Sequence, residues 1–300
     1  MSIKKSCLIF FLGLSLFSVQ SVSYAEVNVG VLAPRGKLNA LKQWKDFAQY
    51  LQEQLQQTVN IVPLPPPDVL SAVKSREIDF LLTNPVHTVS AVESYGATLL
   101  ATLNKLSGPE FAGVIVSKKG SGIKTSKDLL NKNVMSLKFK AAAGAYTFQT
   151  YHLHQRNIDP HKDFASMREG KKQDDLILAV KAGVIDAAFV RTGILESMEK
   201  EGKIKIDEFE IVDQHGPDEL KLLHSTEHYP EWYLSSLKDT DAALAQKLGT
   251  AAMALSADHE AAKSAKIKGF VKPVKMDGMV AALKTLNIAP FNKTGGDACR

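Results

Sequence analysis

The chain has 300 residues, of which 45% are hydrophobic and 23% are charged, and its formal net charge is +5. This composition is ordinary for a folded protein and provides enough apolar residues for two domains of typical size. Without Lys4 and Lys5, which lie in an expected leader, 35 basic residues face 32 acidic ones. This near balance, with no basic run interleaved with aromatic residues, gives no indication of nucleic-acid binding.

Residues 1–25 have the pattern of a secretory signal peptide. Two lysines open the segment, an apolar run follows over residues 8–17, and the small residues Ser23 and Ala25 stand where signal peptidase cleaves. The apolar run is shorter than a membrane span, which disfavours the alternative of an uncleaved anchor. We therefore expect cleavage before Glu26 and a periplasmic protein.

Apolar periodicity predicts alternating strands and helices after the leader. Trp44, Phe47 and Leu51, for example, recur at the spacing of one helical face. The expected strands are 27–32, 59–62, 80–82 and 98–103, and the expected helices are 41–55, 68–74 and one that begins near Pro85. This alternation is typical of α/β proteins.

The same alternation continues after a short crossover at residues 106–110. The expected strands are 111–116, 134–137, 187–190, 209–212 and 220–224. Three expected helices begin at residue 125, after residues 141–145 and at residue 193, and a fourth surrounds Ala179. Two more cover residues 242–255 and 276–286. We place lobe I at residues 26–107 and 217–300 and lobe II at 108–216, each a mixed sheet flanked by helices. Because both crossovers are short, the lobes should hinge about them.

An internal repeat supports two related lobes. Residues 72–79 and 179–186 share the pattern Ala-Val-Lys-x-x-x-Ile-Asp, 107 positions apart, and each precedes an apolar strand. With this offset of 107 positions, Asn84 aligns with Arg191 and Pro85 aligns with Thr192. Open α/β sheets bind ligands at the carboxyl ends of their strands, so we expect these edges to face each other across a cleft.

Candidate ligand-binding residues lie at such strand ends or at the helix starts that follow them: Arg35, Thr83, Asn84, His87, Gly144, Tyr146, Arg191 and Thr192. An arginine offers a bidentate fork to an oxyanion, and the first turn of a helix offers free N–H donors. The alternatives are a surface ion pair for Arg191, a plain helix cap for Thr83 and Asn84, and core packing for Tyr146. Packing also accounts for the aromatic cluster around Trp232.

No metal site or cofactor is expected from the sequence. Cys7 lies in the leader and Cys299 stands alone near the C-terminus, which excludes an internal disulfide and a cysteine metal site in the mature chain. His152 and His154 would point to different faces of a helix. The pair at 224 and 228 lies on an expected loop, and no metal-type spacing joins it to other ligands.

Several of these segments resemble the phosphate, phosphite and phosphonate substrate-binding proteins of ABC transporters. They are residues 30–36, 82–85, 121–129 and 190–196. Arg191-Thr192, together with residues 224–226 and 229–232, is most similar to the periplasmic sensor domains of tetrathionate-sensing histidine kinases. The resemblance implies a type 2 periplasmic-binding-protein fold and a small oxyanion bound between the lobes. Phosphonate binders usually carry hydroxyl side chains at the turn that here reads Ala141 to Ala145, which favours a different oxyanion.

Three functions remain open at this point. The resemblance favours an exported, monomeric binding protein that delivers a phosphonate-like, sulfur or metalloid oxyanion to an ABC transporter permease. The alternative is a periplasmic subunit that presents the bound anion to a membrane histidine kinase. An enzyme is the least favoured, because the sequence has no Gly-x-Ser-x-Gly, Walker or His-Glu-x-x-His motif.

Overall fold

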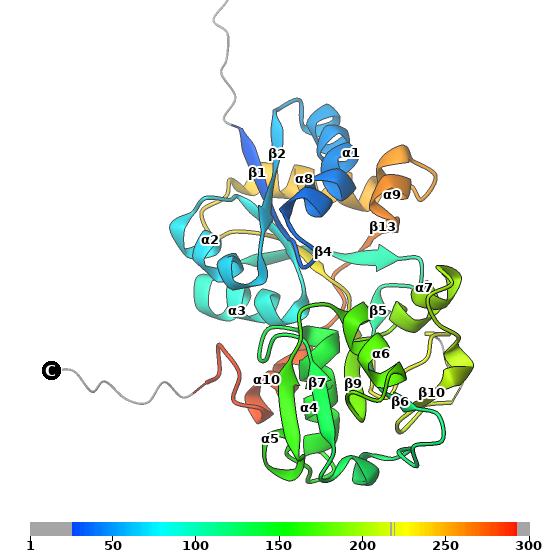
Figure 1. Cartoon of the computed structure of the whole chain (residues 1–300). Helices are drawn as coiled ribbons and strands as arrows, with labels where there is room; N and C mark the ends of the chain where they lie inside the picture. The colour runs from blue at the N-terminus through cyan, green and yellow to red at the C-terminus, as the bar shows by residue number, and fades with distance from the viewer. Residues whose placement is uncertain (1–25, 217, 219, 293–300) are drawn as a thin grey trace, which may run out of the picture.

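The computed structural model describes residues 26–216, 218 and 220–292. The expected signal peptide and Cys299 lie outside these residues. The described chain forms two lobes, each built around its own sheet and flanked by helices (Figure 1). The expected two-lobed α/β fold is confirmed.

Lobe I is built on a six-stranded sheet in the order β13-β4-β12-β3-β1-β2. Its strands are β1 (Val27–Leu32), β2 (Val59–Leu64), β3 (Phe80–Thr83), β4 (Thr98–Lys105), β12 (Tyr233–Ser236) and β13 (Ile267–Val271). Its helices are α1 (Lys37–Leu55), α2 (Val69–Ser75), α3 (Pro85–Tyr95), α8 (Ala242–Ala254) and α9 (Glu260–Ala265). Strand β2 continues through Pro63, which an edge strand tolerates because its outer side needs no N–H donor.

Lobe II is built on a five-stranded sheet in the order β10-β6-β9-β7-β8. Its strands are β6 (Gly113–Lys118), β7 (Asn133–Ser136), β8 (Ser166–Glu169), β9 (Ala187–Arg191) and β10 (Phe209–Ile211). Its helices are α4 (Phe148–His154), α5 (Pro160–Asp163), α6 (Gln173–Lys181) and α7 (Ile194–Lys200), with a short π-helical turn, Ala143–Thr147, leading into α4.

The internal repeat occupies equivalent places in the two sheets. β3 pairs parallel with β1, as β9 does with β7, and each repeat strand has an antiparallel neighbour on its other side. The repeat aspartates also behave alike: Asp79 accepts from Asn28 N–H, and Asp186 accepts from Asn133 N–H, both at 2.7 Å. The shared motif therefore ties the start of β3 and the start of β9 each to its parallel neighbour.

Two short strands carry the chain between the lobes. β5 (Glu110–Phe111) takes it into lobe II, β11 (Tyr229–Pro230) brings it back, and the two pair antiparallel. The strand expected over 220–224 does not form. Instead, Ser225 N–H donates to Gly113 O, and Ser225 Oγ accepts from Ile115 N–H, so this segment is bound to β6.

An apolar cluster joins the two lobes. Val86 of α3 packs with Phe148 of α4, Tyr229 of the return crossover and Leu283 of α10 (Asp277–Thr285). The rings of Phe148 and Tyr229 stack with their centroids 4.0 Å apart. Helix α10, expected in lobe I, thus contacts α3 and α4 together, on the lobe II side of the molecule (Figure 1).

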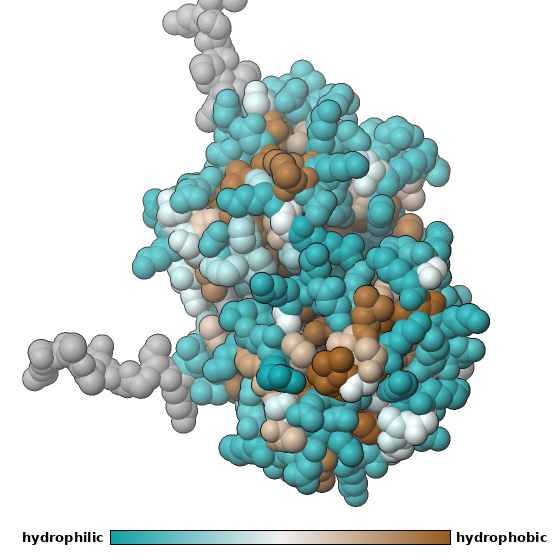
Figure 2. Space-filling view, in the orientation of Figure 1, coloured by the Kyte–Doolittle hydropathy of each residue, from teal (hydrophilic) through white to brown (hydrophobic). Residues whose placement is uncertain are grey.

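The view in Figure 2 shows a largely hydrophilic surface where the two lobes meet. Among the described residues, no helix combines the length and the apolar character that a membrane crossing requires.

Candidate functional site

Three charged side chains from different elements meet beside the crossovers. Arg191 ends β9, Lys105 ends β4, and Glu231 follows β11. Nη2 of Arg191 donates to Oε1 of Glu231 at 2.6 Å, and Nζ of Lys105 lies 3.9 Å from the same oxygen. Glu231 is 0% exposed, so this pairing supplies the neutralisation that a buried carboxylate needs. We call these three residues the crossover cluster.

The crossover cluster carries an excess of positive charge. Burial, followed by the charge of Arg191, lowers the pKa of Lys105 to about 8, with a smaller contribution from Arg35 and with Glu231 opposing them. Arg191 and Arg35 therefore both repel the charge of Lys105, whereas Glu231 attracts it and Asp174 lies beside Arg35. An anion bound there would relieve this mutual repulsion.

Aromatic rings line the crossover cluster. The guanidinium of Arg191 lies over the Phe111 ring, 4.4 Å from its centroid, and Nζ of Lys105 lies 5.7 Å from the centroid of a Trp232 ring. Such stacking orients a cation while leaving its edge free to donate hydrogen bonds.

Gly144 packs against the Phe111 ring and Arg191. A Cβ at this position would stand 2.6 Å from Cε2 of Phe111 and 3.1 Å from Cβ of Arg191. Only glycine fits here unless the Phe111 ring moves. The contribution of Gly144 to the site is therefore the space that it leaves for this ring and for Arg191. The backbone N–H groups at the start of the helical segment from Ala143 are the donors that a helix start leaves free.

Asn84 caps helix α3 and also contacts lobe II. Its Oδ1 accepts from the N–H groups of Val86 and His87, and its Nδ2 donates to Ala141 O at 3.2 Å. The cap satisfies donors of α3 that were expected to meet the ligand. Asn84 therefore connects the α3 start in lobe I with the alanine turn in lobe II.

Thr83 and His87 form a buried pair behind that cap. Thr83 Oγ1 lies 3.2 Å from Nδ1 of His87, and both residues are buried. Burial lowers the pKa of His87 to about 4, so its imidazole is neutral at pH 7.

The remaining candidates are dispersed. Thr192 is bound to the crossover, where its Oγ1 accepts from Ala112 N–H at 3.3 Å. Arg35 is largely exposed and reaches Asp174 of lobe II at 3.9 Å. Tyr146 packs in the interlobe apolar cluster, and its hydroxyl lies 2.9 Å from Nε2 of His161, lining a cavity of about 300 Å³ between lobe II and the segment after α10.

Lys105, Glu231 and Phe111 were missed by sequence reasoning. Lys105 does follow an expected strand directly before a crossover, which is the same signal that singled out Arg35. Glu231 carried no signal, because it sits in an aromatic segment interpreted as packing. Its partner Arg191 is 40 positions away.

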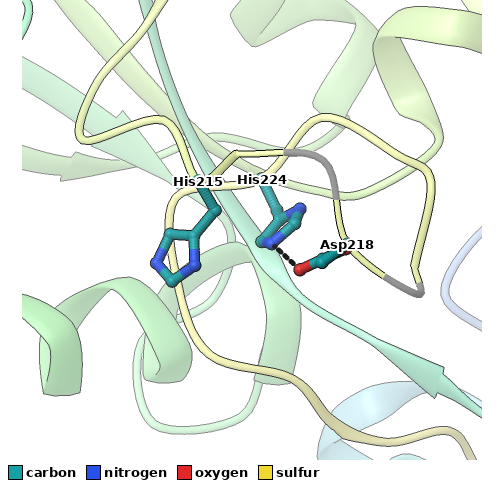
Figure 3. A group of neighbouring side chains, drawn as sticks. All are labelled: His215, Asp218 and His224. Carbon is teal, nitrogen blue, oxygen red and sulfur yellow. Dashed lines mark ion pairs between the residues drawn. The ribbon is translucent and has the colours of Figure 1, made fainter.

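Spacing along the sequence joined His224 and His228 to no other metal-type ligands, but the fold brings His224 into such a group. His215, Asp218 and His224 bring one potential ligand atom each within 4.8 Å of one another (Figure 3). His228 Nε2 lies 2.9 Å from Asp218 Oδ2. The backbone between β10 and β11 folds back on itself here, which a spacing argument along the sequence does not capture.

Residues 29–277 match the ABC-transporter, phosphonate, periplasmic substrate-binding protein family. The chain belongs to this family. Over 227 residues, or 74% of its length, it is 30% identical to the tetrathionate sensor histidine kinase TtrS of Salmonella typhimurium, and it spans only 38% of that relative.

Solved structures agree on the fold. PhnD1 of Prochlorococcus marinus, in complex with methylphosphonate, has a TM-score of 0.72 at 17% identity, with 87% of this chain and 98% of that chain covered. A binding protein component of an ABC phosphonate transporter from Pseudomonas aeruginosa has a TM-score of 0.69 at 16% identity, with 91% and 90% covered. At these identities the likeness concerns the fold.

Proposed function

We propose that this protein captures a small oxyanion between its two lobes and delivers it to the permease of an ABC transporter. The crossover cluster carries the proposal: Arg191 and Lys105, with Arg35 nearby, exceed the charge of Glu231 at the junction of the lobes. Closure around the anion would exclude water and strengthen these charge contacts.

The ligand falls in the class of phosphonate-like, sulfur or metalloid oxyanions. Family membership favours phosphonates, and one solved relative holds methylphosphonate. The alanine turn favours an anion that needs fewer hydroxyl donors, because residues 141–145 carry no hydroxyl, and the N–H groups of Ala141 and Ala142 already donate to Lys138 O. Among the sulfur oxyanions tetrathionate is the first to test, because the curated relative is named as its sensor.

The experiment is a thermal-shift and calorimetric titration of the mature protein. The panel comprises phosphate, phosphite, methylphosphonate, tetrathionate, thiosulfate, sulfate, arsenite and selenite. We expect one of these anions to bind with one-to-one stoichiometry and to raise the unfolding midpoint, since a ligand that binds only the folded state stabilises it. If none of the eight changes the midpoint or releases heat, the proposal fails.

The second candidate is a periplasmic sensory subunit that presents the anion to a membrane histidine kinase. Identity of 30% to a sensor kinase over 74% of this chain supports it. The two functions differ in the partner, so the bound and free protein should be tested against the periplasmic face of each. Ligand-dependent capture by a permease favours transport, and capture by a kinase outer domain favours sensing.

A further inference from the structure

A group of histidines and one aspartate lies in the connection between β10 and β11, outside the crossover cluster. Nε2 of His224 and Nε2 of His228 each lie 2.9 Å from Oδ2 of Asp218, and the two nitrogens lie 3.4 Å apart. His215 stands beside them, with its ring centroid 4.9 Å from that of His224. Figure 3 shows the carboxylate of Asp218 pointing toward the His224 ring.

The tautomer of His224 follows from its other ring nitrogen. Nδ1 lies 2.7 Å from Leu222 O, a carbonyl that can only accept, so Nδ1 carries the proton. In the neutral ring Nε2 then presents a lone pair to the carboxylate oxygen of Asp218, which is also an acceptor. Two acceptors at this distance repel each other unless a proton or a metal ion lies between them, and only a metal ion can bind the carboxylate and both imidazole nitrogens at once. A backbone carbonyl on the second nitrogen is also the usual way of orienting a metal-binding histidine.

The spacing of these atoms suits a small tetrahedral ion. Zinc bonds of about 2.0–2.1 Å to nitrogen and oxygen place neighbouring ligand atoms about 3.3 Å apart. The observed separations are 2.9 Å and 3.4 Å among Asp218, His224 and His228. His215 offers a further nitrogen within 4.8 Å of the Asp218 and His224 ligand atoms, and it would have to move closer to complete a four-ligand set.

The group is anchored on one side and open on the other. His224 is only 2% exposed, its carbonyl accepts from His215 N–H at 3.1 Å, and the adjacent Ser225 is hydrogen-bonded to β6. The side chains of Asp218 and His228 are 31% and 23% exposed, which gives an ion access from solvent. A fixed ligand with accessible partners allows binding with little rearrangement.

We propose that His215, Asp218, His224 and His228 form a Zn²⁺-binding site that closes the connection between β10 and β11. Imidazole with a single carboxylate suits zinc and its transition-metal neighbours rather than Mg²⁺ or Ca²⁺, which prefer oxygen ligands. The bound ion ties His215 and Asp218 to His224 and His228, directly before the return crossover at Tyr229. The ion is separate from the anion site, and it stabilises the connection that leads into the return crossover.

The test uses the mature chain without a histidine tag, freed of metal with EDTA. We expect equilibrium dialysis against micromolar Zn²⁺ to load one ion per chain and to raise the thermal unfolding midpoint, with Mg²⁺ doing neither. The double variant Asp218→Asn/His228→Gln should bind Zn²⁺ at least tenfold more weakly. Both side chains are partly exposed, so this variant should fold, and circular dichroism without zinc checks that it does.

The matched control is His154→Gln, which removes an exposed histidine outside the group. It should bind Zn²⁺ as the parent does. The proposal is overturned if the parent takes up less than one ion per chain, or if the double variant or the milder single variant Asp218→Asn binds as tightly as the parent. Anion titration in the metal-free protein should be unchanged, which separates this site from the crossover cluster.

Discussion

Arg191 has two roles that a substitution will affect together. Its guanidinium pairs with buried Glu231 at 2.6 Å and stacks on Phe111, so it is not simply a free fork in an open cleft. Replacing a free arginine in an open cleft by alanine would leave the stability intact. Arg191→Ala instead leaves a buried carboxylate with only Lys105, 3.9 Å away.

We predict that Arg191→Ala weakens anion binding by about 2–5 kcal/mol and lowers the free energy of unfolding by about 1–3 kcal/mol. Arg191→Lys should recover only part of the binding, because it restores charge without the planar fork. Calorimetry and urea unfolding measure the two effects. Arg168→Ala, an exposed arginine on β8, is the control with the same loss of charge.

The double variant Arg191→Met/Glu231→Gln separates the two roles of Arg191. Removing both charges should restore most of the stability but not the binding. Unchanged binding in Arg191→Ala would place the anion site elsewhere.

Lys105 should make anion binding depend on pH in the alkaline range. Burial and Arg191 lower the pKa of its ammonium to about 8, so it is mostly charged at pH 7 and mostly neutral at pH 9. A bound anion favours the charged form, hence affinity should fall about tenfold over this interval. Tetrathionate is a suitable probe, since its own charge is constant there. Lys105→Met should bind weakly at both pH values, and an equally steep pH dependence in that variant would contradict the assignment.

His87 should make the fold less stable in mild acid. Burial lowers its pKa in the folded state to about 4, below the value of about 6.5 in the unfolded chain. Between these values only the unfolded state binds the proton, so the free energy of unfolding falls as pH decreases, by about 2 kcal/mol from pH 7 to pH 5.

The measurement is urea unfolding of the parent and of His87→Gln at pH 7 and pH 5. The variant should lose most of this difference. Some dependence should remain, because burial also lowers the pKa of His152. Equal pH dependence in both proteins would show that His87 is not buried as a neutral ring.

At the scale of elements, the turn into α4 depends on a close approach. The π-helical turn Ala143–Thr147 brings Gly144 against Phe111 and Arg191, where an added Cβ would stand 2.6 Å from the ring. The ring belongs to strand β5 of the outgoing crossover. The geometry of this turn therefore sets the position of the Phe111 ring, on which the Arg191 guanidinium stacks.

We predict that Gly144→Ala lowers the free energy of unfolding by about 1–3 kcal/mol, because the Phe111 ring has to move. Anion affinity should fall with it, since the ring supports the guanidinium. Gly216→Ala is the matched control: an added Cβ there meets nothing within 4 Å. Equal midpoints for the two variants in thermal unfolding would mean that the turn adjusts without cost.

At the scale of the whole molecule, the lobes are joined by more than two crossovers. The apolar cluster of α3, α4 and α10 spans their boundary, Asn84 Nδ2 donates to Ala141 O, and Arg35 faces Asp174. These contacts connect parts of the chain that either lobe alone would leave exposed. We therefore expect the two lobes to unfold together.

Leu283→Ala tests this coupling, because Leu283 is fully buried in the part of α10 that reaches both lobes. It should lower the free energy of unfolding by about 2–5 kcal/mol and leave a single transition. Tryptophan fluorescence reports on lobe I through Trp44, and circular dichroism reports on all helices. Separate midpoints in the parent protein would contradict the coupling.

The sequence by itself determined the local elements and their class. Helical spacing around Trp44, the cap at Asn84 and the repeated Ala-Val-Lys-x-x-x-Ile-Asp motif act over a few residues, so most strands and helices of both lobes could be predicted. The repeat also located Arg191 at a strand end. Strand β12 was hidden beside the aromatic residues around Trp232, and β13 did not stand out because Lys268 and Gly269 interrupt its apolar pattern.

Only the tertiary structure decided which side chains meet. Glu231 reaches Arg191 because β11 returns beside β5, and α10 lies between α3 and α4 because its apolar face completes a cluster between the lobes. His215 meets His224 through a reversal of the backbone that no periodicity predicts. Patterns in a sequence report on neighbours along the chain, whereas the charge balance of a site depends on neighbours in space, which the packing of distant segments alone brings together.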